Sequence, residues 1–315
     1  MSRCFSFTAW RDSYFRGSFI RNGLRSTTTD SGDGTIVHCW IPSSYSPAKP
    51  SLLCIHGFGA NTMWQFGPLV SRLVQSFNLY IPDLIFFGDS YTIRSDRSTS
   101  FQACCIHSAL SSILPANNLP LDLFGLSYGG FVAYKIAEMF PSMVRRVVLS
   151  SAGICFTEDD IMEGMFHVKS IEEAVEILLP TTPQKIRQLM KLAFHKPPPP
   201  APSCFLNDFI QVMCVKYRQE KRELIYGMIN ERNDGSLPTS ISQPTLVIWG
   251  DDDKIFPIEL AHRLTSHIGD NSKLAIIKNA GHFIPEEKPK ELIKHLKAFL
   301  LNETQAKGPL LHRNH

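Results

Sequence analysis

The chain has 315 residues, of which 43% are hydrophobic and 19% charged, a composition that can bury a large core and excludes a disordered protein. Its formal net charge is only +3, from 32 basic and 29 acidic residues, so nucleic-acid binding has no electrostatic support. No apolar run approaches the roughly 20 residues that cross a bilayer. We therefore expect no transmembrane segment, while peripheral contact with lipid stays open.

Residues 1–23 are expected to form an N-terminal extension. The first 25 residues carry one acid, Asp12, against five arginines, at positions 3, 11, 16, 21 and 25, which faintly resembles an organelle transit peptide. The eight cysteines lack the spacing of a zinc site or a disulfide scaffold. We therefore expect the thiols to be buried and reduced, which favours a reducing compartment. The expected location is the cytoplasm, with the plastid as the alternative.

From residue 24 onward, strand-like and helix-like segments alternate. Residues 24–29 and 35–41 flank an Asp/Gly-rich turn and predict a hairpin. Six short apolar runs follow, typical of strands buried on both faces: residues 51–55, 79–82, 121–124, 146–150, 245–249 and 274–277. Helix-length stretches separate several of them, at 64–75, 101–114, 129–140 and 257–268. This βαβ rhythm predicts a mainly parallel, eight-stranded sheet flanked by helices.

The rhythm breaks between residues 155 and 239, after the sixth predicted strand. Ser170 and Glu173 form a capping box, Thr182 and Pro183 open another helix, and the prolines at 197–200 require an extended chain. A helical insertion at this place predicts a cap over the sheet, although a helical subdomain without a ligand role is the alternative. The predicted core is then residues 24–154 and 240–302, followed by a C-terminal tail at 303–315.

A nucleophile elbow is predicted at Gly125-Leu126-Ser127-Tyr128-Gly129, between an apolar strand and a helix. Such a turn holds Ser127 exposed at the carboxyl edge of the sheet, beside a helix N-terminus that favours a developing oxyanion. The backbone N–H groups of Phe58 and Tyr128 are the candidate oxyanion donors, because each directly follows a strand end. His56, in the same loop as Phe58, is expected to brace that loop rather than act as a base.

A seryl hydroxyl needs a base and an acid to activate it. Among eleven histidines, His282 follows the last predicted strand in a small-residue turn and is the candidate base. The acid is ambiguous from the residues alone. Three adjacent aspartates follow the strand at 245–249, and a further acidic group follows the strand at 146–150; the candidates are Asp251, Asp252, Asp253, Glu158, Asp159 and Asp160.

Over roughly residues 35–300 the chain resembles the α/β-hydrolase superfamily, in particular its monoacylglycerol lipase-like and C–C hydrolase-like branch. The resemblance is carried by motifs at 56–59, 83–90, 125–130, 250–257 and 281–282. It implies the α/β-hydrolase fold and places the acid at Asp253, with Asp251 capping the loop. Asp83 and Asp89 are expected to be structural. Relatives that hydrolyse epoxides or haloalkanes carry an aspartate nucleophile, which Ser127 excludes.

The sequence thus predicts a serine esterase or lipase that cleaves a small or medium-chain carboxylic ester through an acyl-Ser127 intermediate. Alternatives are a hydrolase of C–C bonds in β-diketone-like substrates and a small-molecule receptor with a slow triad. An apolar ester substrate is expected to contact the cap, and neither a metal nor a cofactor is predicted. The oligomeric state is left open. The candidate substrate-binding residues are Met162, Phe166, Met190, Phe209 and Met213.

Overall fold

A nine-stranded, mostly parallel sheet forms the centre of the molecule, with strand order β1-β2-β4-β3-β6-β7-β8-β9 and β5 paired to β2. The computed structural model describes residues 6–115, 118–162, 168, 170–231 and 237–302. The strands are β1 (Leu24–Asp30), β2 (Thr35–Pro42), β3 (Ser51–Ile55), β4 (Asn78–Pro82), β5 (Tyr91–Thr92), β6 (Leu121–Leu126), β7 (Val144–Ser150), β8 (Thr245–Gly250) and β9 (Ser272–Ile277). All eight predicted strands are present. The predicted number of strands was one too low, because β5 spans only two residues, too few to give an apolar pattern.

Strand direction follows the prediction. β1 pairs antiparallel with β2, and β2 pairs antiparallel with β4 and β5. From β4 to β9 every pairing is parallel. The carboxyl ends of β3, β6, β7 and β8 therefore meet at one edge of the sheet, where open α/β sheets bind ligands.

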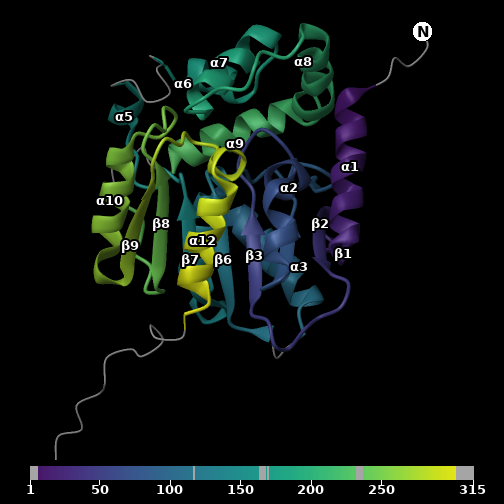
Figure 1. The fold of residues 1–315 in the computed structure, drawn as a ribbon, viewed down its shortest axis with the longest axis vertical. Coiled ribbons are helices and arrows are strands. Elements are labelled where there is room, and N and C mark those ends of the chain that lie inside the picture. Colours follow the sequence, from purple (N-terminus) through teal and green to yellow (C-terminus); the bar gives the residue numbers. More distant parts are fainter. Residues whose placement is uncertain (1–5, 116–117, 163–167, 169, 232–236, 303–315) are drawn as a thin grey trace, which may run out of the picture.

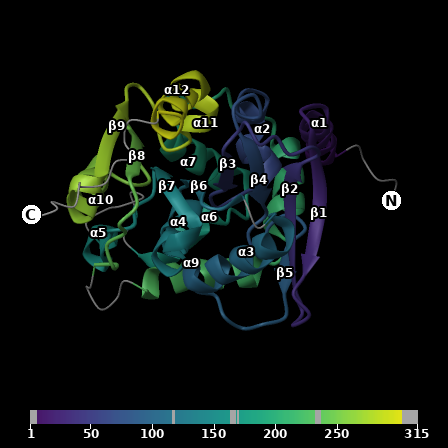
Figure 2. The ribbon, with the colours of Figure 1, turned by 90° about the horizontal axis from the view of Figure 1, so that it is seen from below.

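Helices cover both faces of the sheet (Figures 1 and 2). One face packs against α1 (Phe7–Arg21), α2 (Thr62–Leu73) and α12 (Pro289–Leu300), with the short α11 (Ile284–Glu287) beside them. The other face packs against α3 (Thr99–Ile113), α4 (Tyr128–Met139) and α10 (Ile258–Ile268). Two 3₁₀ turns, Pro141–Met143 and Gly269–Asn271, lead into β7 and β9. Because both faces are covered, β3 and β6 are buried along their whole length.

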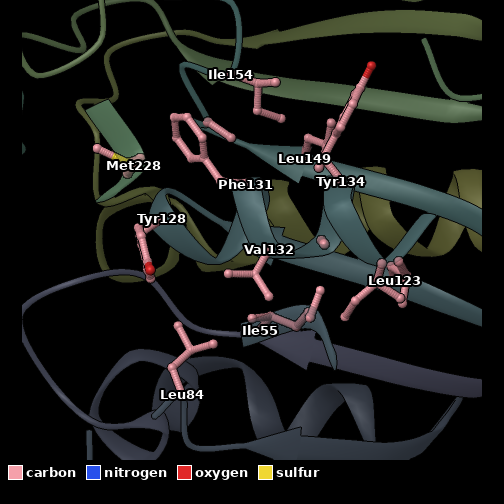
Figure 3. Packing of buried hydrophobic residues seen from close by; sticks show 14 of the residues in the cluster. Ile55, Leu84, Leu123, Tyr128, Phe131, Val132, Tyr134, Leu149, Ile154 and Met228 are labelled. Carbon is pink, nitrogen blue, oxygen red and sulfur yellow. The ribbon is translucent and has the colours of Figure 1, made fainter. Parts of the chain in front are cut away.

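The apolar core beneath the turn at Ser127 is built by α4 against the central strands. Figure 3 shows Phe131 and Val132 of α4 among Ile55, Leu123 and Leu149 of β3, β6 and β7. All five side chains are buried. Full burial of a side chain of this kind contributes roughly 1.5–3 kcal/mol, so the strand ends around Ser127 rest on a rigid base.

Between β7 and β8 the described residues form five helices over the carboxyl edge of the sheet (Figure 1). They are α5 (Glu158–Met162), α6 (Ile171–Leu178), α7 (Pro183–Ala193), α8 (Ser203–Phe209), which continues as a π-helical turn at Ile210–Cys214, and α9 (Arg218–Asn230). The predicted caps are present: the Ser170 hydroxyl accepts the N–H of Glu173, and the Thr182 hydroxyl accepts the N–H of Lys185. This is the segment for which the sequence predicts a cap, and its status as a separate domain stays a prediction.

The described part of the predicted N-terminal extension packs against the body of the protein as α1. Ser6 caps α1 by accepting the N–H of Ala9. Phe15 and Phe19 are buried, and the Phe19 ring lies 5.2 Å from that of Trp40. The sequence did not predict this helix. The predicted tail at 303–315 lies outside the described residues.

None of the helices in the described ranges is long and apolar enough to cross a membrane. Five of the seven described cysteines are buried, whereas Cys104 and Cys204 are exposed, so the expectation of buried thiols fails for these two. Cys4 lies outside the described residues.

Candidate active site

Ser127 sits in a strained turn between β6 and α4. Its φ of 53° and ψ of −121° are a conformation that costs a non-glycine residue about 1–3 kcal/mol. The residues two positions before and after Ser127 must be glycines, because a side chain at either position would collide with neighbouring backbone atoms. A Cβ at Gly125 would lie 2.6 Å from the carbonyl oxygen of Gly129, and one at Gly129 would lie 2.3 Å from the carbonyl oxygens of Ile55 and His56. The Ser127 N–H donates to the Ser150 carbonyl at 2.8 Å, which fixes the turn to β7.

His282 and Asp253 complete a chain of hydrogen bonds to this serine. The His282 Nε2 lies 2.8 Å from the Ser127 Oγ, and its Nδ1 lies 2.8 Å from the Asp253 Oδ2. The other carboxylate oxygen of Asp253 accepts the N–H groups of Ile255 and Phe256, both at 2.9 Å. Asp253 and His282 are each only 8% exposed. The carboxylate is thus aimed at the imidazole, and the imidazole at the hydroxyl.

The rival acids are engaged elsewhere. Asp252 lies 2.9 Å from both the His195 Nδ1 and the Lys254 Nζ; burial alone would raise its pKa, but these hydrogen bonds outweigh that effect and lower it. Asp251 accepts the N–H of Ala280 at 3.4 Å, in line with its expected loop-capping role.

The acidic group after β7 also lies away from His282. Asp160 accepts two hydrogen bonds from the guanidinium of Arg263. Asp159 is exposed, and the side chain of Glu158 is outside the described part. Of the six acids that the sequence left open, the structure therefore brings Asp253 to the histidine.

The loop after β3 lies beside the elbow: the Phe58 ring is 5.8 Å from the Tyr128 ring. Gln65 of α2 braces this loop: its side-chain oxygen accepts the N–H of Gly57 at 2.8 Å, and its amide group donates to the carbonyl oxygens of Gly57 and Phe58. Across the elbow, Tyr128 is the first residue of α4, so its N–H has no partner within the helix. The sequence did not single out Gln65, because a buried glutamine in a helix has no motif of its own.

His56 lies in the same loop and holds it to the loop that follows β4. Its Nε2 accepts the N–H of Leu84 at 3.0 Å, and its Nδ1 lies 2.7 Å from the carbonyl oxygen of Gly57. Complete burial lowers the pKa of His56, which keeps the ring neutral and suits both contacts. Both ring nitrogens of His56 are thus engaged with backbone groups that hold this loop.

Asp83 occupies a buried position behind the loop. It accepts from the His38 Nδ1 at 2.8 Å and from the Thr62 N–H at 3.0 Å. Burial would raise its pKa, but the His38 contact and the N–H bond prevail and lower it. A Cβ at Gly88, where φ is +51°, would collide with the Asp83 carboxylate. These contacts explain why residue 88 is a glycine, and they agree with a structural role for Asp83. Asp89, in contrast, is exposed and lies 3.7 Å from the Arg16 guanidinium.

Glu287 of α11 ties the loop that carries His282 to the end of α7. Its Oε2 accepts the N–H groups of Gly281 at 2.7 Å and His195 at 3.1 Å, and its Oε1 accepts that of Lys196 at 3.1 Å. The Phe283 N–H adds a bond to the Ala193 carbonyl. We call this set of bonds the Glu287 clamp. It gives the histidine loop and the start of the proline run a common attachment.

A cavity of about 1110 Å³ opens above Ser127 and His282. Its lining is mostly apolar and comes from the elbow, the Phe58 loop, α1, α6, α7, α8 and the proline run at 197–200. Two of the cations among its lining residues have partners: the Arg11 guanidinium stacks over Trp64 at 4.8 Å and lies 4.0 Å from Glu286, and Arg187 donates to the Ala201 carbonyl. Lys191, also at the cavity wall, is exposed.

The structure places some of the predicted substrate-binding residues at this cavity. Met190 and Phe209 line it. Met213 does not; it lines a smaller cavity of about 210 Å³ behind the Phe58 loop, together with Lys221. Burial of the Lys221 side chain lowers its pKa to about 8. Phe166 and the side chain of Met162 lie outside the described residues.

Several cavity residues went unnoticed in the sequence. Phe7, Thr8 and Arg11 come from α1, and Pro197 to Pro200 form a wall. Neither set carries a motif, because both reach the cavity through tertiary packing alone. Across the described residues, no cluster of three or more His, Cys, Asp or Glu side chains could hold a metal ion.

Comparison with known proteins fits this geometry. The model of the alpha/beta hydrolase family matches residues 52–295. The chain belongs to this family. As an α/β hydrolase it is 30% identical to monoacylglycerol lipase ABHD6 of Mus musculus over 264 residues, which cover 80% of this chain and 76% of the mouse protein.

Solved structures of two other α/β hydrolases share the fold. The carboxylesterase CesB of Bacillus subtilis superposes with a TM-score of 0.68 at 20% identity, covering 92% of this chain and 97% of its own. The 2-hydroxy-6-oxo-6-phenylhexa-2,4-dienoate hydrolase of Rhodococcus sp. strain RHA1 gives a TM-score of 0.71 at 17% identity, covering 87% and 98%. At these identities the likeness concerns the fold alone.

Proposed function

We propose that this α/β hydrolase cleaves carboxylic esters through an acyl intermediate on Ser127. The observation that carries the proposal is the unbroken chain of hydrogen bonds from Asp253 through His282 to Ser127, which opens onto a large apolar cavity. Three residues from three separate loops meet in the order that nucleophilic catalysis requires.

In the acylation step the Ser127 Oγ attacks the ester carbonyl carbon while the His282 Nε2 takes the hydroxyl proton. Asp253 stabilises the imidazolium that forms and keeps the proton of the neutral ring on Nδ1. The negative charge on the carbonyl oxygen is accepted by the N–H groups of Phe58 and Tyr128, and loss of one such donor costs about 10²–10³ in kcat in a serine protease. His282 then gives its proton to the leaving alcohol.

Deacylation repeats these steps with water. His282 removes a proton from the water that attacks the acyl carbon, and the second tetrahedral intermediate uses the same two N–H donors. Collapse releases the acid and returns the proton to Ser127. No further group is required, because every proton that moves passes between Ser127, His282, the leaving alcohol and water.

The proposed substrate is an uncharged ester with an apolar acyl chain, such as a monoacylglycerol. The cavity is mostly apolar, and two of the cations at its wall, Arg11 and Arg187, already have partners. Each methylene buried adds roughly 0.8 kcal/mol, so activity should rise with chain length until the cavity is full. The similarity to the mouse lipase supports the same substrate class.

The test is covalent labelling followed by a substrate series. A fluorophosphonate should label the wild-type protein and not Ser127→Ala, and p-nitrophenyl esters from acetate to laurate should show kcat/KM rising with chain length, with a monoacylglycerol also hydrolysed. Labelling that persists in Ser127→Ala refutes the nucleophile. A requirement for a substrate carboxylate favours C–C bond hydrolysis of β-diketone-like acids, and a single turnover per protein favours a receptor.

A further inference from the structure

The smaller cavity, of about 210 Å³, is separate from the candidate active site, since neither Ser127 nor His282 lines it. Its lining includes the exposed residue Lys216 as well as buried side chains, among them Phe87 and Lys221. The cavity therefore leads from the surface to a buried floor. Its volume is below the roughly 300–1,000 Å³ of sites for drug-sized ligands, so it suits a small molecule.

The ammonium group of Lys221 is buried at this cavity without a counter-ion. The side chain is 5% exposed, and its Nζ donates to the Met213 carbonyl at 2.8 Å and lies 5.1 Å from the centre of the Phe87 ring. Within the described ranges no carboxylate oxygen lies within 4.0 Å of this nitrogen. An ammonium group has three N–H donors, and buried charges are normally paired. Two donors of Lys221 thus have no acceptor among the described residues.

Lys216 brings a second such ammonium group to the same cavity. Its Nζ donates only a long bond, of 3.5 Å, to the Gly88 carbonyl, and it too has no carboxylate within 4.0 Å in the part of the chain that the structure describes. Burial is the main cause of the lowered pKa of Lys221, and the charge of Lys216 lowers it further. A pKa of about 8 leaves Lys221 mostly protonated at pH 7, so both groups carry charge.

The carboxylates that line the cavity, in contrast, have partners of their own. These partners are His38 and Thr62 for Asp83, Asn61 and Trp64 for Asp12, and Arg16 for Asp89. Arg16 is thereby paired as well. The formal charges at the cavity are close to balanced, so an anion is recognised not by a net positive field but by direct contact with the two unpaired lysines, because Coulomb attraction falls with distance.

The lining beside the lysines is partly apolar, with Met63, Phe86, Phe87 and Met213. We propose that this cavity binds a small carboxylate with a short apolar chain, whose oxygens accept N–H groups of Lys221 and Lys216. A carboxylate accepts on both oxygens, and charge-assisted bonds of this kind are the strong ones. Ester hydrolysis releases acids of this class, and that link rests on the function proposed above, whereas the binding itself does not.

Calorimetric titration with sodium hexanoate tests the site, and hexan-1-ol supplies the same chain without the charge. We expect the wild-type protein to bind hexanoate at least about tenfold more tightly than hexanol. Lys221→Met removes the donors but keeps an apolar side chain, and it should weaken hexanoate binding about tenfold or more. Lys216→Met, at the exposed end, should weaken it up to about fivefold. The matched control is Lys191→Met, at the wall of the large cavity, which should leave hexanoate binding unchanged.

Hexanol that binds as tightly as hexanoate, or hexanoate binding that Lys221→Met leaves unchanged, overturns the proposal. Loss of binding in Lys191→Met with binding kept in Lys221→Met also overturns it, because the acid then occupies the large cavity. Replacement of a buried charge by an apolar side chain is often tolerated, and thermal unfolding checks this for Lys221→Met.

If Lys221→Met does not fold, Lys216→Met decides: this variant should lose part of the preference for hexanoate over hexanol, and an unchanged preference overturns the proposal. The titration uses no ester. A protein that binds hexanoate but hydrolyses no ester therefore refutes the proposed function and leaves this site in place.

Discussion

Replacing Asp253 by Asn is expected to reverse the proton pattern of His282 while keeping the shape of the site. One carboxylate oxygen of Asp253 accepts the N–H groups of Ile255 and Phe256. An asparagine must keep its single oxygen there, because its NH₂ group cannot accept these bonds. The NH₂ group then faces the His282 Nδ1, which must become an acceptor. The ring proton moves to Nε2, the atom that should receive the Ser127 proton.

The size of the effect follows from this change of tautomer. The equivalent substitution in a serine protease lowers kcat by about 10⁴, which corresponds to about 5 kcal/mol in the activation barrier. Asp253 does not line the cavity, so KM should change little. Stability should also change little, because both backbone N–H groups keep their acceptor.

Steady-state hydrolysis of p-nitrophenyl butyrate measures kcat and KM separately. The matched control is Asp252→Asn, which breaks a partly exposed contact with His195 and Lys254 and should cost no more than about fivefold. The reasoning is wrong if Asp253→Asn retains a tenth or more of the wild-type kcat. An inactive Asp160→Asn would instead place the functional acid after β7.

Three further substitutions test how the site is held. Gly129→Ala should lower the free energy of unfolding by at least about 2 kcal/mol, measured by denaturant titration, since its Cβ would meet rigid backbone. Glu287→Gln should lower kcat by about tenfold with a small change in Tm, because the Gly281 loop loses an anchor; an unchanged kcat would contradict this. The pKa of Asp83 is lower in the folded protein than in the unfolded chain. The ionised carboxylate therefore stabilises the fold fully at a pH above its pKa in the unfolded chain, and this stabilisation is lost as the pH falls through its pKa in the folded protein. Asp83→Asn should therefore unfold more easily than wild type at pH 7, and the difference should shrink below about pH 4.

The strands and the elbow could be predicted because they depend on local patterns. Buried parallel strands appear in the sequence as continuous apolar runs. The elbow appears as a pair of glycines, because the space around Gly125 and Gly129 permits no side chain. A few adjacent residues are therefore enough to predict the strands and the elbow. His282 was chosen as the candidate base in the same way, from its position after the last predicted strand. The acid was different: three adjacent aspartates are locally equivalent, and only the path of the loop turns Asp253 toward the histidine.

The cavity could be predicted only in part, because its walls come from distant segments. α1 was missed since Trp10 and Tyr14 lie on its exposed face while Phe15 and Phe19 lie on its buried face, which removes the single apolar stripe that marks a surface helix. Met213 was expected at the cavity from its helical spacing. It lies within the π-helical turn Ile210–Cys214, where the spacing departs from 3.6 residues per turn, and it faces the smaller cavity.

The Glu287 clamp joins one wall of the cavity to the histidine loop, so the two walls should respond differently to redesign. The wall formed by Pro197–Pro200 begins at Lys196, whose N–H shares the Glu287 carboxylate with the Gly281 loop. A larger or smaller residue in this wall would therefore shift His282 and change the rate of the chemical step together with substrate choice. The opposite wall, from α1 and α8, has no hydrogen bond of this kind to the histidine loop among the described contacts. Acyl selectivity can be tuned there, at Phe7 or Phe205, with turnover preserved.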